Sequence, residues 1–241
     1  MWYKLKRIMM RPNGVEKQVR PIWWQPWANT VAYRPLTSAT TVNDQSWNSN
    51  NLTNSNVVFG TAHWIDCATI SWNSDTIHSA SIYLYWNISW LPTWANSRTF
   101  SRWMYQDGAA SSHDACYIFQ WQASTNNMVL IAQWVDGSWD ILISQYWTGA
   151  VFGSPTIWAW CNHVVVYDWS KFVYYINSVS VGTWTYTINT WSTKFSLWWA
   201  SENPAWNSFN WAFSNVILED KARTAQEVSD YYNLTKANYG L

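Results

Sequence analysis

Four residues in the middle of the chain have side chains of the kinds that bind sugars. Tyr105 and Trp134 offer aromatic rings on which the apolar face of a sugar stacks, and Gln133 and Asp136 can hydrogen-bond its hydroxyl groups. They lie in or beside β-rich runs, so we expect adjacent strands to present them as a carbohydrate-binding surface. The alternative interpretation is that Tyr105 and Trp134 are packing residues of a core or a sheet surface.

The acidic residues do not have the spacing that hydrolysis of a glycosidic bond requires. A glycoside hydrolase places two carboxylates on either side of that bond. The four glutamates of the chain are Glu16, Glu202, Glu219 and Glu227. Glu219 adjoins Asp220, so on a strand these two side chains point to opposite faces. We therefore predict that the protein is not an enzyme, with glycoside hydrolysis as a remote alternative.

Neither the cysteines nor the histidines form a metal-binding or redox motif. The three Cys residues stand outside any Cys-x-x-Cys pair, and the four His residues are scattered along the chain. The sequence has no serine-hydrolase, zinc-protease or phosphate-loop motif. The formal net charge is zero, which gives no general attraction to nucleic acid. We expect no cofactor from these residues and no nucleic-acid partner.

Tryptophan is abundant and glycine is scarce, with 24 Trp against 8 Gly. Trp47, Trp169 and Trp211 lie in turn-like contexts, where Gly is the physically suited residue. One hypothesis is that many Trp stand for Gly, as when a UGA codon that the organism reads as Gly is translated as Trp. The alternative is a Trp-rich sugar-binding protein with many stacking platforms. Trp134 and Trp160 lie in strand-like contexts, so we expect them to be genuine and buried.

The stretch richest in β-forming residues has the pattern of a hairpin. The runs 163–167 and 172–177 are β-branched and aromatic, and the polar residues 168–171 join them. A turn of this length needs a residue that tolerates positive φ, and Trp169 is a poor choice because its Cβ clashes in the left-handed region. The segment therefore predicts a hairpin with a strained turn.

With Gly in place of Trp169, this hairpin resembles the central hairpin of the laminin-G-like, concanavalin A-like lectin/glucanase superfamily, whose pattern is roughly W-x-H-V-x-x-x-x-D-G…Y-V-N-G. Segments near residues 44–52, 91–103 and 209–216 resemble further parts of that superfamily when their Trp are read as Gly. The residues that match the structural motif are Trp160, His163, Asp168, Asn177 and Phe209.

The resemblance implies an all-β fold, a two-sheet antiparallel β-sandwich with jelly-roll connections and one short C-terminal helix. Thr224 and Glu227 have capping-box spacing, so the helix should begin there. Some members of the superfamily bind calcium with Asp oxygens at the rim of the sandwich. The candidate calcium ligands here are Asp44, Asp136 and Asp140, and turn formation is the alternative for each.

The first residues differ in charge from the rest of the chain. Residues 1–27 hold six basic side chains and one acidic side chain, a net charge of +5, and the remainder carries −5. We interpret 1–27 as a basic N-terminal extension and 28–241 as the sandwich domain. The extension is either flexible or an arm that docks on a partner protein or an acidic surface. No signal peptide or transmembrane segment is visible.

Two functions from different classes fit these observations. The first is a non-catalytic carbohydrate-binding or adhesion module, whose partner is a glycan or a surface protein. The second is a structural or interaction domain of a surface appendage or a phage-like particle, without a glycan ligand. The resemblance implies an extracellular, cell-surface or virion location for either.

Overall fold

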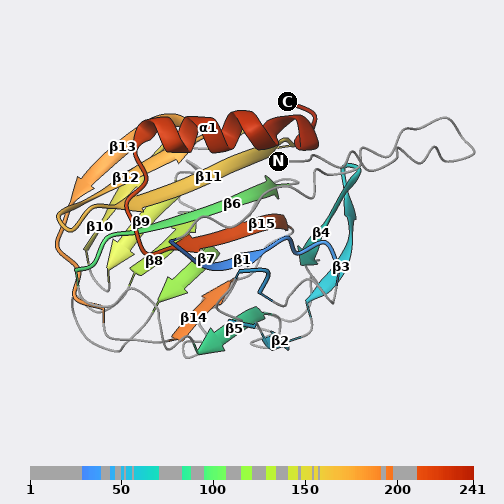
Figure 1. Cartoon of the computed structure of the whole chain (residues 1–241), viewed down its shortest axis with the longest axis horizontal. Helices are drawn as coiled ribbons and strands as arrows, with labels where there is room; N and C mark the ends of the chain where they lie inside the picture. The colour runs from blue at the N-terminus through green and yellow to red at the C-terminus, as the bar shows by residue number, and fades with distance from the viewer. Residues whose placement is uncertain are drawn as a thin grey trace, which may run out of the picture.

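In its described residues, the computed structural model consists mainly of antiparallel β-sheet, followed by one short helix and a 3-10 turn (Figure 1). The described residues are 29–38, 44–46, 50–51, 53–55, 57–70, 83–87, 95–106, 115–120, 129–133, 141–145, 148–153, 155–156, 158–190, 194–197 and 211–241. The extension 1–27 lies outside them, so the boundary at residue 28 stays a prediction. None of the described helices is long and apolar enough to cross a membrane.

The strands form two sheets, which we call the front sheet and the back sheet after their positions in Figure 1. The front sheet contains, in spatial order, β13 (Val179–Thr185), β12 (Lys171–Ile176), β11 (Trp160–Tyr167), β6 (Arg98–Gln106), β15 (Trp211–Glu219), β4 (Ile65–Ile70) and β3 (Val58–Ala62), and β1 (Thr30–Arg34) also pairs with β15. The back sheet contains β10 (Thr148–Phe152), β9 (Ile141–Gln145), β8 (Val129–Gln133), β7 (Ala115–Gln120), β14 (Lys194–Leu197), β5 (Tyr83–Asn87) and β2 (Thr53–Ser55).

The main core lies between the two sheets. Phe100 and Met104 of β6 pack there with Val165 of β11, and Ile143 and Phe152 come from the back sheet. Side chains two residues apart on a strand share a face, so Phe100 and Met104 point into this space together. The expected all-β architecture with antiparallel sheets is confirmed, while the jelly-roll connections stay a prediction.

The front sheet is buried on its outer face as well, because the C-terminal helix covers it. Helix α1 (Ala225–Thr235) continues into the 3-10 helix η2 (Lys236–Tyr239), and Val228 packs on Val164 and Val166 of β11. The capping box forms: the Thr224 hydroxyl accepts from the Glu227 amide at 3.2 Å, and the Glu227 carboxylate accepts from the Thr224 amide at 2.9 Å. The helix predicted from this spacing is confirmed.

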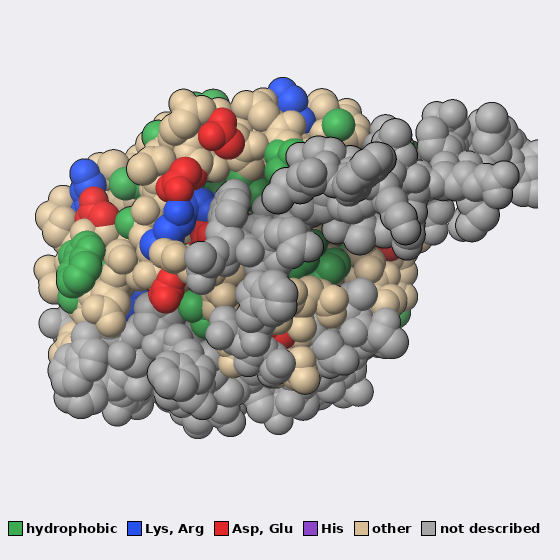
Figure 2. All heavy atoms as spheres, in the orientation of Figure 1, with side chains coloured by type: hydrophobic (Ala, Val, Ile, Leu, Met, Phe, Trp, Pro, Cys, Tyr) green, Lys and Arg blue, Asp and Glu red, His purple; other side chains and the backbone are tan. Residues whose placement is uncertain are grey.

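A buried ion pair and a surface ion pair hold the segment between β15 and α1. The Arg223 guanidinium donates to the Glu219 carboxylate, and both side chains are fully buried. Lys221 lies 2.5 Å from Glu227 in a half-exposed pair. Figure 2 shows acidic and basic side chains close together on this face, between the helix and the front sheet. Burial raises the pKa of Glu219 even beside Arg223, whereas the hydrogen bond from Lys221 lowers the pKa of Glu227.

The hairpin predicted for residues 163–177 is present. Strands β11 and β12 pair from His163↔Ile176 to Tyr167↔Phe172. In the turn between them Trp169 has a φ of 84° and is 60% exposed. Trp160 is buried on β11, as expected. Both observations agree with the expected difference between turn and strand tryptophans.

Two further tryptophans are also exposed at positive φ, whereas Trp211 lies in a strand. Trp64 and Trp158 also have positive φ, at 69° and 64°, and both are exposed. Trp211, expected at a turn, bulge or tight approach in a segment that resembles the closing strand of the superfamily, is the first residue of β15 and pairs with Ile70 and Gln106, so the strand forms there and the turn does not. Its neighbours Ala212 and Phe213 are apolar and continue the strand. Trp47 and Trp134 lie outside the described residues.

Candidate functional site

The carbohydrate-binding surface expected from the sequence does not form as predicted. Tyr105 is on β6 in the front sheet, and Gln133 ends β8 in the back sheet, so the two residues are not on adjacent strands. Tyr105 is also buried and therefore belongs to the packing alternative. The reason for the error is that strand content predicts strands but not the sheet to which each one belongs. Trp134 and Asp136 lie outside the described residues.

The motif residues His163 and Trp160 are structural. Both are buried on β11, and the His163 Nδ1 atom hydrogen-bonds the hydroxyl of Tyr174. Burial, assisted by the nearby positive charge of Arg102, holds the pKa of His163 well below its usual value. A neutral imidazole enclosed in this way has no access to a substrate. Phe209, the last motif residue, lies outside the described residues.

Asp168 and Asn177 stabilise the two turns at the ends of β12. The Asp168 carboxylate accepts hydrogen bonds from the amides of Ser170 and Lys171, at 3.3 Å and 3.1 Å. The Asn177 side chain accepts from the Asn162 amide at 2.8 Å, and Asn177 itself has a φ of 50°. Asn tolerates this left-handed conformation better than most residues. Both motif residues therefore have a structural role in the turns that flank β12.

Asp44 has the surroundings of a turn residue. One carboxylate oxygen accepts from the Tyr33 amide at 2.8 Å, and the other accepts from the Ser46 hydroxyl at 2.6 Å and the Asn50 amide at 2.9 Å. Together with the bond from the Asn50 side chain to the Val31 carbonyl, these bonds tie residues 44–46 and Asn50 to β1. Among the described residues, no three His, Cys, Asp or Glu side chains come together as a metal-binding group. Asp136 and Asp140 lie outside the described part, so a calcium role for them stays a prediction.

The described glutamates have structural partners. Glu219 is enclosed with Arg223 beneath the helix, and Glu227 completes the capping box. Among the described side chains, neither faces a second carboxylate across an open space in the way that glycoside hydrolysis requires. Glu16 and Glu202 lie outside the described residues.

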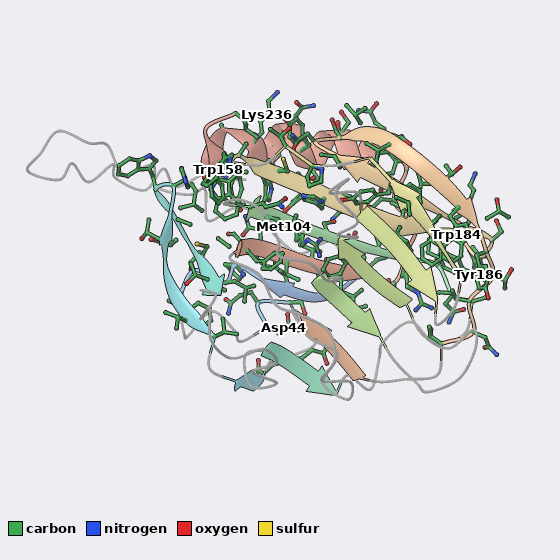
Figure 3. The ribbon with its side chains drawn as sticks, turned by 180° about the vertical axis from the view of Figure 1, so that it is seen from behind. Asp44, Met104, Trp158, Trp184, Tyr186 and Lys236 are labelled. Carbon is green, nitrogen blue, oxygen red and sulfur yellow. The ribbon has the colours of Figure 1, made fainter. Side chains whose placement is uncertain are left out.

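Among the described residues, the strongest candidate binding surface is a stack of three aromatic rings at the edge of the front sheet, on the inner face, where the two outer rings pack against the main core. Phe172 of β12 is buried, and the ring of Trp184 on β13 stacks on it with centroids 5.6 Å apart and planes 19° apart. The ring of Tyr186 follows, 4.6 Å from Trp184 and tilted by 26°. Trp184 and Tyr186 are each half-buried, so the stack runs from the core to the surface. Figure 3 shows these two side by side at one end of the molecule.

Backbone pairing fixes this stack in place. Trp184 is opposite Phe172 in the β12–β13 register, and the Tyr186 amide donates to the Ser170 carbonyl at 2.8 Å. The Tyr167 hydroxyl accepts from the Ile188 amide at 3.1 Å, which holds the chain beyond Tyr186. The strand and its extension are thus bonded to the β11–β12 turn. A surface supported this way loses little conformational freedom when it binds a ligand.

A second group of aromatic rings covers the opposite end of the front sheet. His63 stacks on Tyr105 with centroids 4.0 Å apart, Tyr105 lies 5.8 Å from Trp160, and Trp160 lies 5.1 Å from Tyr239. Trp103 stacks on Tyr239 at 3.9 Å. The rings other than His63 are buried, and so they join the sheet to the C-terminal helix. This group is mainly a packing cluster.

Sequence reasoning missed Trp184 and Tyr186, although a signal was present. Residues 180–188 form a β-rich run in which aromatic residues stand two apart, which places them on one face of a strand. The sequence does not show which residue these rings stack on, because Phe172 comes to lie beneath Trp184 only when β13 pairs with β12.

No family model matches the chain, and no curated protein matches it by sequence. Solved structures do match. The binding domain of botulinum neurotoxin serotype G superposes with a TM-score of 0.66 at 12% identity, covering 87% of this chain and 52% of that one. The binding domain of Paraclostridial Mosquitocidal Protein 1 gives a TM-score of 0.64 at 13% identity, covering 85% and 52%. The chain shares their fold.

These comparisons correct the family assignment. The matching structures named above are binding domains, and two further matches are described as botulinum neurotoxin receptor-binding domains, so the assignment to the laminin-G-like, concanavalin A-like superfamily is wrong. The motifs that suggested it are short strand-and-turn patterns, read with Gly in place of Trp, which different antiparallel sheets can satisfy. The chain spans about half the length of the structures it matches.

Proposed function

We propose that this chain is a non-catalytic binding module that recognises a glycan or a glycan-bearing receptor outside the cell. The observation that carries the proposal is its likeness in fold, over 86% of its length, to a solved receptor-binding domain of botulinum neurotoxin type G. The described residues add a rigid aromatic surface and no pair of carboxylates arranged for hydrolysis. One of the matching structures belongs to a neurotoxin whose cell entry depends on interaction with two ganglioside molecules.

A printed array of neutral and acidic oligosaccharides, probed with the full chain, tests this function. We expect binding to a restricted set of glycans that is competed by the same sugars in solution. Size-exclusion chromatography with light scattering on the same sample tests the structural alternative. Defined oligomers with no glycan signal would favour the structural domain and overturn the binding module. Turnover of a bound oligosaccharide would overturn the non-catalytic part of the proposal.

A further inference from the structure

We infer that the protein made in its own cell carries glycine, by reading of UGA as Gly, at the three turn positions where its sequence has Trp64, Trp158 and Trp169. These residues have φ of 69°, 64° and 84°, in the left-handed region where the Cβ of a bulky residue clashes with the backbone. Glycine has no Cβ and adopts this region freely. Among the described residues, positive φ is found at three tryptophans but at only one glycine, Gly240. The inference does not depend on the proposed function.

The first position lies at the tip of the β3–β4 hairpin. The pair Ala62↔Ile65 closes a two-residue loop of His63 and Trp64. Both loop residues have positive φ, at 44° and 69°, as a type I′ turn requires. The usual sequence of such a turn is Asn-Gly, and His tolerates the left-handed region better than most residues. Glycine at position 64 therefore completes an ordinary hairpin turn.

The second position lies at a bulge where β11 begins beside β6. In the β11–β6 register Trp160 is opposite Tyr105. Continuing that register would place residue 159 opposite Gln106, yet it is the Trp158 amide that donates to the Gln106 carbonyl, at 2.8 Å. Two residues therefore lie opposite one. In a bulge of the G1 kind, the first of these two residues is a glycine in the left-handed conformation, and Trp158 holds that place with φ 64°.

The third position lies in the β11–β12 turn. The Asp168 amide donates to the Lys171 carbonyl at 3.1 Å, which leaves Trp169 and Ser170 as a two-residue loop. Of these two residues, only Trp169 has positive φ. This is the pattern of a type II′ turn, whose first loop residue is normally Gly. Three different kinds of turn thus place Trp where each of them normally has Gly.

A tryptophan on a strand has the opposite surroundings. Trp103 of β6 is fully buried, and its ring stacks on Tyr239 with centroids 3.9 Å apart. The three turn tryptophans are each at least 60% exposed. Glycine at the turns removes both the steric cost and the exposed apolar surface, whereas glycine at position 103 would empty the core. Rings at the three turns are then no part of a surface that binds a glycan.

The test reads the gene and the protein from its own cells. We expect TGA codons at positions 64, 158 and 169, and fragment spectra of peptides from the native protein should show Gly there. Trp103 is the internal control: its codon should be TGG and its native peptide should contain Trp. TGG codons at the three turn positions, or Trp in their native peptides, would overturn the inference.

Thermal unfolding of the chain expressed with standard translation gives a second readout. The triple variant Trp64→Gly, Trp158→Gly, Trp169→Gly should unfold about 6–12 °C higher than the all-Trp chain, because three strained turns relax. The matched variant Trp103→Gly removes a buried ring and should unfold at a lower temperature than the all-Trp chain. A triple variant that unfolds at or below the temperature of the all-Trp chain would show that these turns accept Trp, which contradicts the inference.

Discussion

The ring of Phe152 lies against the α-carbon of Gly182, in the space that a side chain at that position would occupy. Phe152 ends β10, at the edge of the back sheet, and Gly182 lies in β13, at the edge of the front sheet. Phe152 is buried and packs at 5.8 Å from the ring of Tyr174. One side of the two-sheet assembly is therefore closed by an aromatic ring that requires glycine opposite it.

Gly182→Ala should destabilise the protein by about 1–3 kcal/mol, because the new methyl group overlaps the Phe152 ring and the surrounding core is closely packed. Gly60→Ala is the matched control, since a Cβ on Gly60 of β3 has no atom within 4 Å. We expect that control to be neutral or slightly stabilising. Urea unfolding at constant temperature measures both, and equal midpoints for the two variants would contradict the close approach.

Trp169→Gly should stabilise the fold by about 1 kcal/mol. A bulky residue at φ 84° carries a steric cost of about 1–2 kcal/mol that Gly avoids, and the entropic cost of Gly offsets part of this gain. The hydrogen bond from the Tyr167 hydroxyl goes to the Trp169 carbonyl, which the substitution leaves in place. The opposite result is expected at buried Trp160, where Trp160→Gly should cost about 3–5 kcal/mol. Thermal unfolding of both variants checks the pair, and destabilisation at both positions would show that the turn favours Trp.

Local features of the fold could be predicted from the sequence because their causes are local. Thr224 and Glu227 are three residues apart, and the capping box needs nothing else. The turn at Asp168 is equally contained within a few residues. Trp211 shows the limit: its neighbours in sequence indicated a turn, but pairing with β4 and β6 extends β15 through it.

The candidate site depended on contacts that sequence spacing does not encode. Tyr105 and Gln133 have suitable side chains, yet they belong to different sheets. The Trp184 ring stacks on Phe172 because the β12–β13 register places those residues opposite each other. Residue type therefore indicated which side chains have the chemistry to contact a sugar, and strand pairing decided which aromatic rings lie together.

Arg223→Met should destabilise the protein by about 3–5 kcal/mol, because it leaves the Glu219 carboxylate buried without its cation. Replacing both residues, Arg223→Met with Glu219→Leu, should recover most of that loss, since neither charge is then enclosed. Lys221→Met removes the half-exposed pair with Glu227 and a weaker charge interaction with Glu219, and it should cost less than about 1 kcal/mol. Denaturant unfolding of the three proteins tests the order. A double variant as unstable as Arg223→Met would show that the pair does more than neutralise Glu219.

The buried His163 makes stability depend on pH in a direction that its surroundings determine. Enclosure and the charge of Arg102 lower its pKa in the folded protein, whereas the unfolded chain titrates near the ordinary value of 6.5. At pH values between these two pKa values, the unfolded state binds a proton on His163 and the folded state does not. Stability should therefore fall as pH falls below about 6.5, and the loss should level off once the folded pKa is passed. The raised pKa of Glu219 affects stability in the opposite sense: it makes the folded state more stable as the pH falls. This effect begins at more acidic pH than that of His163, because a carboxyl group in the unfolded chain titrates at lower pH than a histidine.

Lowering the pH from 7.5 to 5 should cost the unmodified protein up to about 2 kcal/mol through His163. The variant His163→Gln keeps a hydrogen-bonding group for the Tyr174 hydroxyl but has no titrating ring, so it should lack this part of the pH dependence. Glu219 and every other carboxyl group are common to both proteins, and their contributions cancel in the difference. Urea unfolding of both proteins at the two pH values measures that difference. Parallel losses would mean that His163 takes up its proton while folded, with water or a neighbouring group reaching the ring.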